Sequence, residues 1–355
     1  MPKVSVILPC FNVSKYIERA MNCLQNQTLP DIEIICVDDK STDNTLELLH
    51  KLESQHKNMR VIALAENSGV SVARNTGIDT AMGEYIGFMD PDDYVDADFY
   101  EKLYKHAVAE KADVCMGNIA EHFADGQIKK HTFRVENVIK EKCRFDYTMW
   151  CAIYKRKFIS DNKIYCPVGI TNGEDTVFCI QSAALANKIV GVTDTYYHYV
   201  RYENSAETTW YSEKQVDAHI KMAKAIVKFI NEHDISKTEY RHYFGVAFYS
   251  VCHTVFDRTT RRDLHKKSLQ CAVDIFNKCK YKSYFANPYI GPYLICGDAD
   301  GLCEYLTEKS KKNYIVKISL FKLINLITVK REPNRAKIYV FGIPMFYVFW
   351  HRKDK

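Results

Sequence analysis

Several features of secreted proteins are missing from this sequence. Its 355 residues include thirteen cysteines, but the number is odd and no two form a C-x-x-C pair or show zinc-site spacing. Cys36, Cys115 and others lie inside apolar runs, where a free cysteine packs as a small apolar side chain. The pattern disfavours a disulfide framework and is typical of a reducing cytoplasm.

Long apolar runs are missing as well. No stretch of 18 apolar residues occurs, so the sequence predicts no membrane-spanning helix. The chain runs from Met1-Pro2-Lys3 directly into the apolar segment Val4–Leu8, without the charged region, apolar core and cleavage site of a signal peptide. We therefore expect a cytoplasmic protein.

Charge is distributed unevenly along the chain. The formal net charge is +5, yet residues 309–355 hold twelve Lys or Arg against two acids, Glu332 and Asp354, so the remainder is acidic. A basic tail on an acidic body predicts an anionic partner for the tail alone. The aliphatic content of the tail and the acidic body argue against nucleic acid as that partner.

Residues 1–120 alternate apolar runs with helical periodicity. We expect helices from about Ser41, over about Val70–Ala81 and from near Asp96. Near-continuous apolar strands separated by helices indicate a mostly parallel sheet covered on both faces. Residues 121–210 look irregular and aromatic-rich, and 213–280 become helical again. The predicted strands are Val4–Leu8, Ile32–Val37, Val61–Leu64 and Tyr85–Met89.

Polar clusters follow all four predicted strands. Because the carboxyl ends of parallel strands meet at one sheet edge, these clusters should converge there. Three carboxylates in the last cluster repel one another, and folding alone gives no reason for them. Carboxylates suit hard cations such as Mg²⁺ and Mn²⁺, which commonly also hold phosphate, so we expect a metal-dependent enzyme with a phosphorylated or nucleotide-linked substrate. The clusters are Pro9-Cys10-Phe11-Asn12, Asp38-Asp39, Glu66-Asn67 and Asp90-Pro91-Asp92-Asp93.

Together these motifs resemble the family 2 glycosyltransferases over about residues 1–205. The resemblance implies the α/β GT-A (Rossmann-like) fold, a mostly parallel sheet flanked by helices, over residues 1–210. A smaller helical region, 211–310, and a basic amphipathic tail, 311–355, would follow. Two departures are Phe11, where the family often has Tyr, and Lys40, where it often has Gly. The matching residues are Val4–Asn12, Val37–Thr45, Glu66-Asn67-Ser68-Gly69 with Arg74-Asn75, and Asp90–Asp93.

The resemblance assigns donor binding to ten residues. Asp39 would accept the N3–H of uracil, which makes UDP the expected nucleotide, and Arg74 would offset donor charge. Alternatively, Asp38 and Asp39 are turn or cap residues before the next helix, a role we expect for Asp38, and Arg74 is a solvated helix charge. The ten residues are Pro9, Phe11, Asn12, Asp39, Asn67, Gly69, Arg74, Asp90, Asp92 and Arg201.

The resemblance also implies a Mn²⁺ or Mg²⁺ site. Asp90 and Asp92 form the Asp-x-Asp signature of its ligands, with His198 as a third ligand or, alternatively, a satisfied interior group. Arg201 would clamp a phosphate. The alternative for Asp92 and Asp93 is that they cap the helix expected from near Asp96.

The acceptor side of the expected site centres on Glu174-Asp175, at the start of an expected helix. The resemblance makes Asp175 the general base that takes a proton from an attacking hydroxyl. Glu174 and Trp150 would contact the acceptor or sugar. The alternatives are helix capping for the acids and core packing for Trp150.

These assignments predict a single in-line displacement with inversion of the sugar. The expected reaction moves a hexose or N-acetylhexosamine from a UDP-sugar to a hydroxyl of a bacterial surface glycan, for example in capsule or lipopolysaccharide biosynthesis. One alternative is an inactive nucleotide-sugar-binding scaffold tethered to the membrane. A sugar nucleotidyltransferase is disfavoured, because Pro9-Cys10-Phe11-Asn12 is not a Gly-rich loop with Arg.

The tail supports a lipid-linked glycan acceptor. A cationic amphipathic helix expected over Asn313–Val329 would lie on an anionic membrane surface, with the enzyme peripheral at the inner face of the cell membrane. An aromatic segment follows at Ile338–Trp350, broken by Gly342 and Pro344. Alternatively, both pieces pack on the catalytic domain or form a homo-oligomer interface. The helix pattern consists of Tyr314, Ile318, Phe321 and Ile324 with Lys311, Lys312, Lys317 and Lys322.

Overall fold

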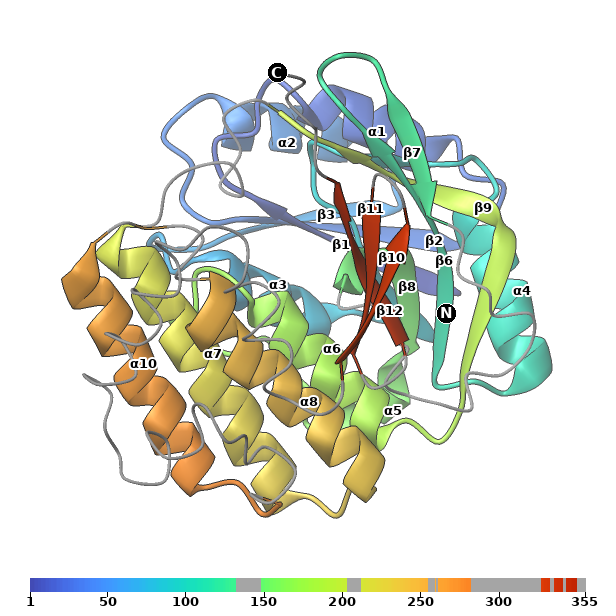
Figure 1. Ribbon diagram of the computed structural model, residues 1–355. Coiled ribbons are helices and arrows are strands. Elements are labelled where there is room, and N and C mark those ends of the chain that lie inside the picture. The colour runs from blue at the N-terminus through green and yellow to red at the C-terminus, as the bar shows by residue number, and fades with distance from the viewer. Residues whose placement is uncertain are drawn as a thin grey trace, which may run out of the picture. The chain divides into compact units, whose positions relative to one another are not determined.

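The computed structural model divides the chain into two compact units, Met1–Thr209 and Trp210–Lys355 (Figure 1). The residues that it describes are 1–131, 148–202, 212–254, 259, 261–281, 327–332, 335–340 and 343–349.

The first unit is built on a nine-stranded mixed sheet of order β3-β2-β1-β4-β8-β6-β9-β5, with β7 paired to β6. β1 pairs in parallel with β2 and β4, and β2 with β3, which confirms the four parallel strands expected from the sequence. β8 is antiparallel to β4 and β6, whereas β6 and β9 are parallel. The strands are β1 Val4–Cys10, β2 Ile32–Asp38, β3 Met59–Ala63, β4 Tyr85–Phe88, β5 Tyr94–Val95, β6 Val114–His122, β7 Ile128–His131, β8 Ala152–Lys155 and β9 Ile189–Val200.

Helices connect these strands in the order expected of an α/β unit. The helix expected from Ser41 begins at Thr45, and the one expected near Asp96 begins at Phe99. α3 packs against β1 at Gly77, where a Cβ atom would lie 2.3 Å from Ile7 Cγ2, so only glycine allows this approach. The helices are α1 Ile17–Gln25, α2 Thr45–Gln55, α3 Val70–Thr80, α4 Phe99–Glu110, α5 Arg156–Asp161 and α6 Glu174–Leu185, with a 3₁₀ turn at Met149–Cys151.

The expectation that residues 121–210 are irregular was wrong for the described part. β7, β8, α5, α6 and β9 all fall in this range. β9 escaped notice because tyrosines and polar residues mix along it, Ile189–Val200, so that neither face reads as purely apolar. Thr195 and Tyr197 on one face are buried and hydrogen-bonded, and His198 on the other face is also hydrogen-bonded.

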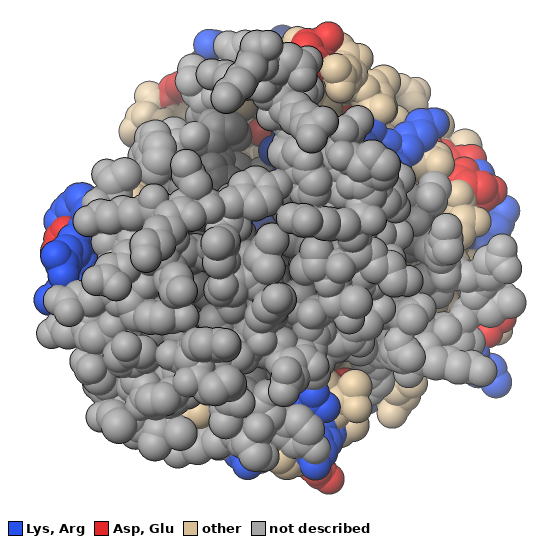
Figure 2. Space-filling model, in the orientation of Figure 1, with Lys and Arg blue, Asp and Glu red and all other residues tan. Residues whose placement is uncertain are grey.

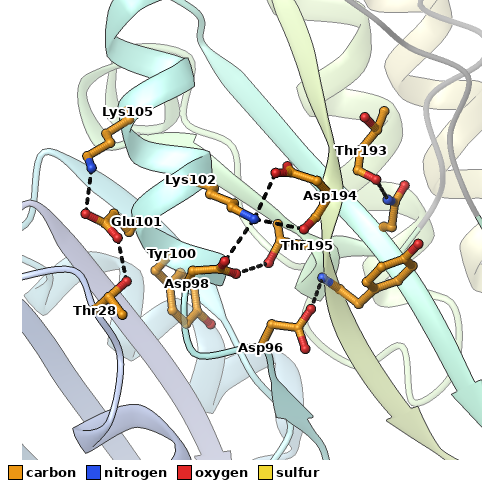
Figure 3. A network of polar contacts seen from close by, with 12 residues as sticks. Thr28, Asp96, Asp98, Tyr100, Glu101, Lys102, Lys105, Thr193, Asp194 and Thr195 are labelled. Atoms are coloured by element: carbon orange, nitrogen blue, oxygen red, sulfur yellow. Dashed lines mark hydrogen bonds and ion pairs between the residues drawn. The ribbon is translucent and has the colours of Figure 1, made fainter.

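A polar network fixes β9 to α4 (Figure 3). Lys102 makes ion pairs of 2.8 Å with both Asp98 and Asp194, and Thr195 donates to Asp98 at 2.8 Å. Asp96 accepts the backbone N–H of Tyr196 at 2.8 Å. On the face drawn in Figure 2, described basic and acidic side chains likewise adjoin at several points. The network therefore fixes the position of residues 194–196 of β9, which precede the part of the strand at the candidate site.

The second unit contains the helical region expected from the sequence. α7, Glu213–Glu232, packs against α8, Lys237–Tyr249, and α10, Arg262–Asn277, with a π-helical turn at Ser250–Thr254 after α8. None of the helices in the described ranges is long and apolar enough to cross a membrane.

Near its C-terminus the chain forms a three-stranded antiparallel sheet, β10 Ile327–Glu332, β11 Arg335–Val340 and β12 Ile343–Phe349. The helix expected over Asn313–Val329 was wrong at its end, because residues 327–329 belong to β10. Its remaining residues, including all the Lys and apolar positions of the expected amphipathic pattern, lie outside the described residues.

Candidate active site

The first residue of the loop after β2 is hydrogen-bonded to the last residue of β1. The backbone N–H of Asp39 donates to the Cys10 carbonyl at 2.8 Å, which carries the parallel pairing past the strand ends. Asn12, with φ 54°, turns its side chain toward the second loop, where Oδ1 accepts the N–H groups of Thr42 and Asp43 at 2.8 and 3.3 Å. Asn12 therefore fixes the shape of this edge. Pro9 is partly buried within β1, and Phe11 beside Asn12 is 45% exposed.

Asp39 joins the second loop to the third. Its two carboxylate oxygens accept the N–H groups of Ser68 and Gly69 at 2.7 and 2.8 Å, and Asn67 donates to its carbonyl at 3.1 Å. Gly69, with φ 90°, is the N-cap of α3. Asp39 thus does not cap α2, whose N-cap is Asn44.

Asp38 makes the turn expected of it, although it does not cap the helix. Its Oδ2 accepts the N–H of Ser41 at 3.2 Å, in an Asx-type turn. The residue is 1% exposed.

Arg74 is a buried ion-pair centre rather than a solvated helix charge. Its residue exposure is 5%, and its Nη atoms donate to Glu174 at 2.7 Å and Asp90 at 3.0 Å. Burial alone would lower the pKa of the guanidinium, but the charges of Asp90 and Glu174 raise it overall. One side chain therefore links α3, the end of β4 and the start of α6.

The acidic loop is tied to β9 by Asp93. Asp93 is 1% exposed and accepts the Tyr197 hydroxyl at 2.9 Å and the Val200 N–H at 2.8 Å. The Tyr197 oxygen in turn accepts the N–H of Asp90 at 3.1 Å. Asp93 is thus a structural tie and caps no helix, because the N-cap of α4 is Asp98.

Asp90 and Asp92 offer oxygen ligands of the kind that Mg²⁺ and Mn²⁺ take. Burial and the charge of Asp90 raise the pKa of Asp92, so a cation at this place would relieve like-charge repulsion. In the described part of the chain the Asp92 carboxylate hydrogen-bonds to no other residue, although Arg19 donates to its main-chain carbonyl. The pair fits a divalent cation in part, since the described residues bring together no group of three ligating side chains.

His198 has protein partners on both ring nitrogens. Nε2 lies 2.8 Å from Asp96 Oδ1, and Nδ1 lies 2.8 Å from His122 Nε2. The ring also stacks on Tyr94 with centroids 4.4 Å apart. Metal ligation by His198 would therefore require one of these hydrogen bonds to break.

Asp175 lies in the first turn of α6 beside the Arg74 ion pairs. Its Oδ1 accepts the N–H of Thr176 at 2.7 Å. Burial and the charge of Glu174 raise its pKa to about 7, against the opposing charge of Arg74. A carboxylate with this pKa can take a proton from a hydroxyl near neutral pH.

Trp150 and Arg201 lie along one face of β9. Trp150 is 8% exposed, with its ring centroid 4.2 Å from that of Tyr197 and 5.5 Å from that of Tyr199. Arg201, just past the strand, donates from Nε to Glu121. The sequence did not point to Tyr197, Glu121 or Asp93 as partners, because their pairing depends on strand register that local patterns do not give.

Comparisons with known proteins agree on one family. The family described as "Glycosyl transferase family 2" matches residues 5–165. Glycosyltransferase GlyG of Streptococcus pneumoniae serotype 4 is 31% identical over 220 residues, which cover 58% of this chain and 73% of GlyG. A poly(ribitol-phosphate) beta-glucosyltransferase of Bacillus spizizenii is 34% identical over 205 residues, 56% of this chain but 32% of that protein, so the match spans about a third of its length.

The fold has a close counterpart among solved structures. The crystal structure of S. aureus TarS 1–349 in complex with UDP-GlcNAc has a TM-score of 0.73 and 21% sequence identity, covering 98% of this chain and 99% of that one. This likeness confirms the α/β GT-A fold expected from the sequence.

Proposed function

Because this chain belongs to glycosyl transferase family 2, we propose that it is a metal-dependent inverting glycosyltransferase. It moves a hexose or N-acetylhexosamine from a UDP-sugar to a hydroxyl of a bacterial surface glycan. The observation that carries the proposal is Asp175, whose pKa is raised to about 7 and which lies one residue from the Glu174–Arg74–Asp90 ion pairs. This neighbourhood supports Asp175 as the proton acceptor.

Donor binding is supported by the convergence of the first three loops on Asp39. Its carboxylate has an orientation fixed by Ser68 and Gly69, and each oxygen keeps a lone pair for a further donor such as a uracil N–H. TarS, the structural counterpart, was solved with UDP-GlcNAc, and this supports UDP as the nucleotide. Pro9, Phe11, Asn12, Asn67 and Gly69 complete the proposed nucleotide side.

In the proposed reaction Asp175 takes the acceptor proton as the hydroxyl attacks the anomeric carbon on the face opposite UDP. Arg201 stabilises the charge that grows on the departing diphosphate. Asp90 and Asp92 would hold Mn²⁺ or Mg²⁺, which supplies positive charge against a diphosphate when bound. Arg74 keeps Asp90 and Glu174 in place, and Glu174 and Trp150 lie on the proposed acceptor side.

His198 is proposed as a third ligand only in a rearranged state. Ligation through Nε2 would release Asp96, and ligation through Nδ1 would release His122. A mannosyltransferase of Pyrobaculum calidifontis solved with GDP-Man and Mn²⁺, at a TM-score of 0.54, supports the choice of metal.

For the acceptor, we propose a glycan or lipid-linked glycan at the inner face of the cell membrane, reached through the basic C-terminal tail. Relatives named as poly(ribitol-phosphate) glycosyltransferases support a polymer as the acceptor class. Sedimentation with anionic vesicles tests the tail. A variant lacking residues 311–355 should stay in the supernatant, and equal pelleting of both proteins would contradict the membrane role.

The deciding experiment combines binding with turnover. Thermal stabilisation by UDP, GDP, CDP and ADP is measured with Mn²⁺ and with EDTA, and UDP-sugars are then screened for transfer. A metal-dependent shift with UDP, followed by a product of inverted configuration, is the expected result. A shift without any turnover would favour the inactive nucleotide-sugar-binding scaffold, and a shift with another nucleotide would overturn the uracil assignment.

A further inference from the structure

The guanidinium of Arg201 is held by several neighbouring side chains. Its Nε donates to Glu121 Oε1. The rings of Phe123 and Tyr199 face it, with centroids 5.5 and 5.8 Å from the guanidinium carbon. One carboxylate and two aromatic rings therefore restrict the direction of the guanidinium plane.

Strand register builds this pair into the sheet. Glu121 of β6 lies opposite Tyr199 of β9, and side chains two residues apart on a strand share a face, so Glu121 and Arg201 are diagonal neighbours. The N–H of Arg201 donates to the His122 carbonyl at 2.9 Å, which continues the ladder by one residue. A change of register would separate the two charges.

Glu121 is itself held from its other side. It is 7% exposed, and its second oxygen, Oε2, lies 3.1 Å from His131 Nε2. Burial alone would raise the pKa of Glu121, but the hydrogen bond from His131 and the charge of Arg201 lower it overall. The carboxylate is thus held between His131 and Arg201, and both partners favour its ionised form.

The same face of β9 leads back to the acidic loop. Tyr197, Tyr199 and Arg201 follow one another along this face, where the Trp150 ring stacks on Tyr199 and lies tilted against Tyr197. The Tyr197 hydroxyl holds the backbone N–H of Asp90. The Asp93 carboxylate accepts the N–H of Val200, the residue before Arg201, at 2.8 Å, so Arg201 directly follows a strand segment that is tied to the acidic loop.

We propose that Glu121 is a positioning residue for the donor diphosphate, acting through Arg201. By holding Nε, Glu121 presents the guanidinium to phosphate oxygens in one prepared orientation, so that little side-chain entropy is lost on binding. This inference rests on the proposed function. It adds Glu121 of β6, which lies outside the donor motifs, to the residues that prepare the donor site.

The test compares UDP with uridine, which lacks the diphosphate. With Mn²⁺ present, Glu121→Gln should weaken UDP binding about tenfold. This is the lower end of the loss in affinity expected when a group that orients a ligating side chain is removed. Uridine affinity should stay unchanged, because general damage to the nucleotide site would weaken both. In turnover, the KM for the UDP-sugar should rise in step with the loss of UDP affinity.

A double-mutant cycle shows whether Glu121 acts through Arg201. Arg201→Lys keeps the charge but loses the planar Nε–H, so adding Glu121→Gln to it should change UDP affinity less than twofold. Glu110→Gln, which removes an ion pair with Lys188 of 2.6 Å, is the control and should bind UDP like the wild type.

Four outcomes would overturn the inference: unchanged UDP affinity in Glu121→Gln, tighter binding, an equal loss for uridine, or additive effects in the cycle. Tighter binding would mean that Glu121 competes with the diphosphate for Arg201. Failure of the wild type to bind UDP would instead overturn the proposed function, and with it this inference.

Discussion

Arg74 and Glu174, one hundred residues apart in the chain, form a buried ion pair with Nη1 and Oε1 2.7 Å apart. The second Nη of Arg74 binds Asp90, so the helix that carries Asp175 and the strand that ends in the acidic loop share one cation. The proposed proton acceptor and the proposed metal ligands are therefore mechanically connected. We therefore predict that both stability and activity depend on Arg74.

Replacement of Arg74 should be costly. Arg74→Ala leaves two acids facing each other without their cation, and loss of one partner of a buried pair typically costs about 3–5 kcal/mol. Because Asp90 is partly exposed, we expect the lower end of that range in urea unfolding. Arg74→Lys should recover only part of the lost stability, because an ammonium keeps the charge but lacks the planar fork that reaches both acids.

A matched control for Arg74 is Lys157, whose pair with Asp161 lies at the surface. Its side chain is 79% exposed, and Lys157→Ala should cost no more than about 0.5 kcal/mol. If Arg74→Ala unfolds at the same urea concentration as this control, the ion pairs do not support the fold.

Asp175→Asn should abolish transfer while donor binding remains. An amide takes up no proton, so kcat should fall about 10²–10⁴-fold, and the thermal shift with UDP should stay as in the wild type. Near-normal transfer by this variant would show that another group is the base.

The pH dependence of transfer should report the same group. The pKa of Asp175 is raised to about 7, and only the ionised carboxylate accepts a proton, so kcat/KM should rise with pH and level off above about 7. Glu174→Gln removes the negative charge that raises the pKa of Asp175. It also frees Arg74 from its ion pair with Glu174, and the charge of Arg74 lowers the pKa of Asp175. Both effects move the midpoint to lower pH, and a midpoint that moves upward would contradict the assignment.

Lys40 and Asn12 should respond to glycine in opposite directions. Both have positive φ, 60° and 54°, a region that costs a residue with a Cβ atom about 1 kcal/mol. Lys40→Gly removes this strain, and the gain should be at most about 1 kcal/mol because glycine is freer when unfolded. Asn12→Gly also loses the hydrogen bonds from Thr42 and Asp43 and should destabilise by about 1 kcal/mol. Urea unfolding of both variants checks the contrast, which would be refuted by changes of the same sign.

The sequence predicted the parallel half of the sheet well and the long-range half poorly. Val4–Leu8 and Ile32–Val37 are nearly continuous apolar runs, broken only by Ser5 and Glu33, so a local sequence window identifies them as strands. Asp93 finds its partners Tyr197 and Val200 on β9, and Glu121 finds Arg201 just past that strand, through pairings of β9 with β5 and β6 that join distant segments. Similarly, the resemblance drew attention to Arg74, but its burial between two acids is a property of helix packing that no local pattern contains.

His219 and His242 should make the second unit sensitive to acid. Both are buried, at 7% and 2% exposure, and burial lowers the pKa of each to about 4, below the usual 6.5. Between these values the unfolded chain binds more protons than the folded one. Their contribution to stability is therefore complete above about pH 6.5 and is lost as the pH falls toward 4, by on the order of 3 kcal/mol for each residue.

Urea unfolding of the full chain at several pH values, followed by hydrogen exchange of α7 and α8 amides, measures this loss. His219→Asn removes one titrating ring but also changes the 2.6 Å contact with Ser250, so it should lower stability at pH 7 and flatten the decline below it. His50→Asn removes an imidazole that is 56% exposed and should leave the slope unchanged. A decline that stays equally steep in His219→Asn and His242→Asn would mean that carboxylates, not these histidines, set the acid response.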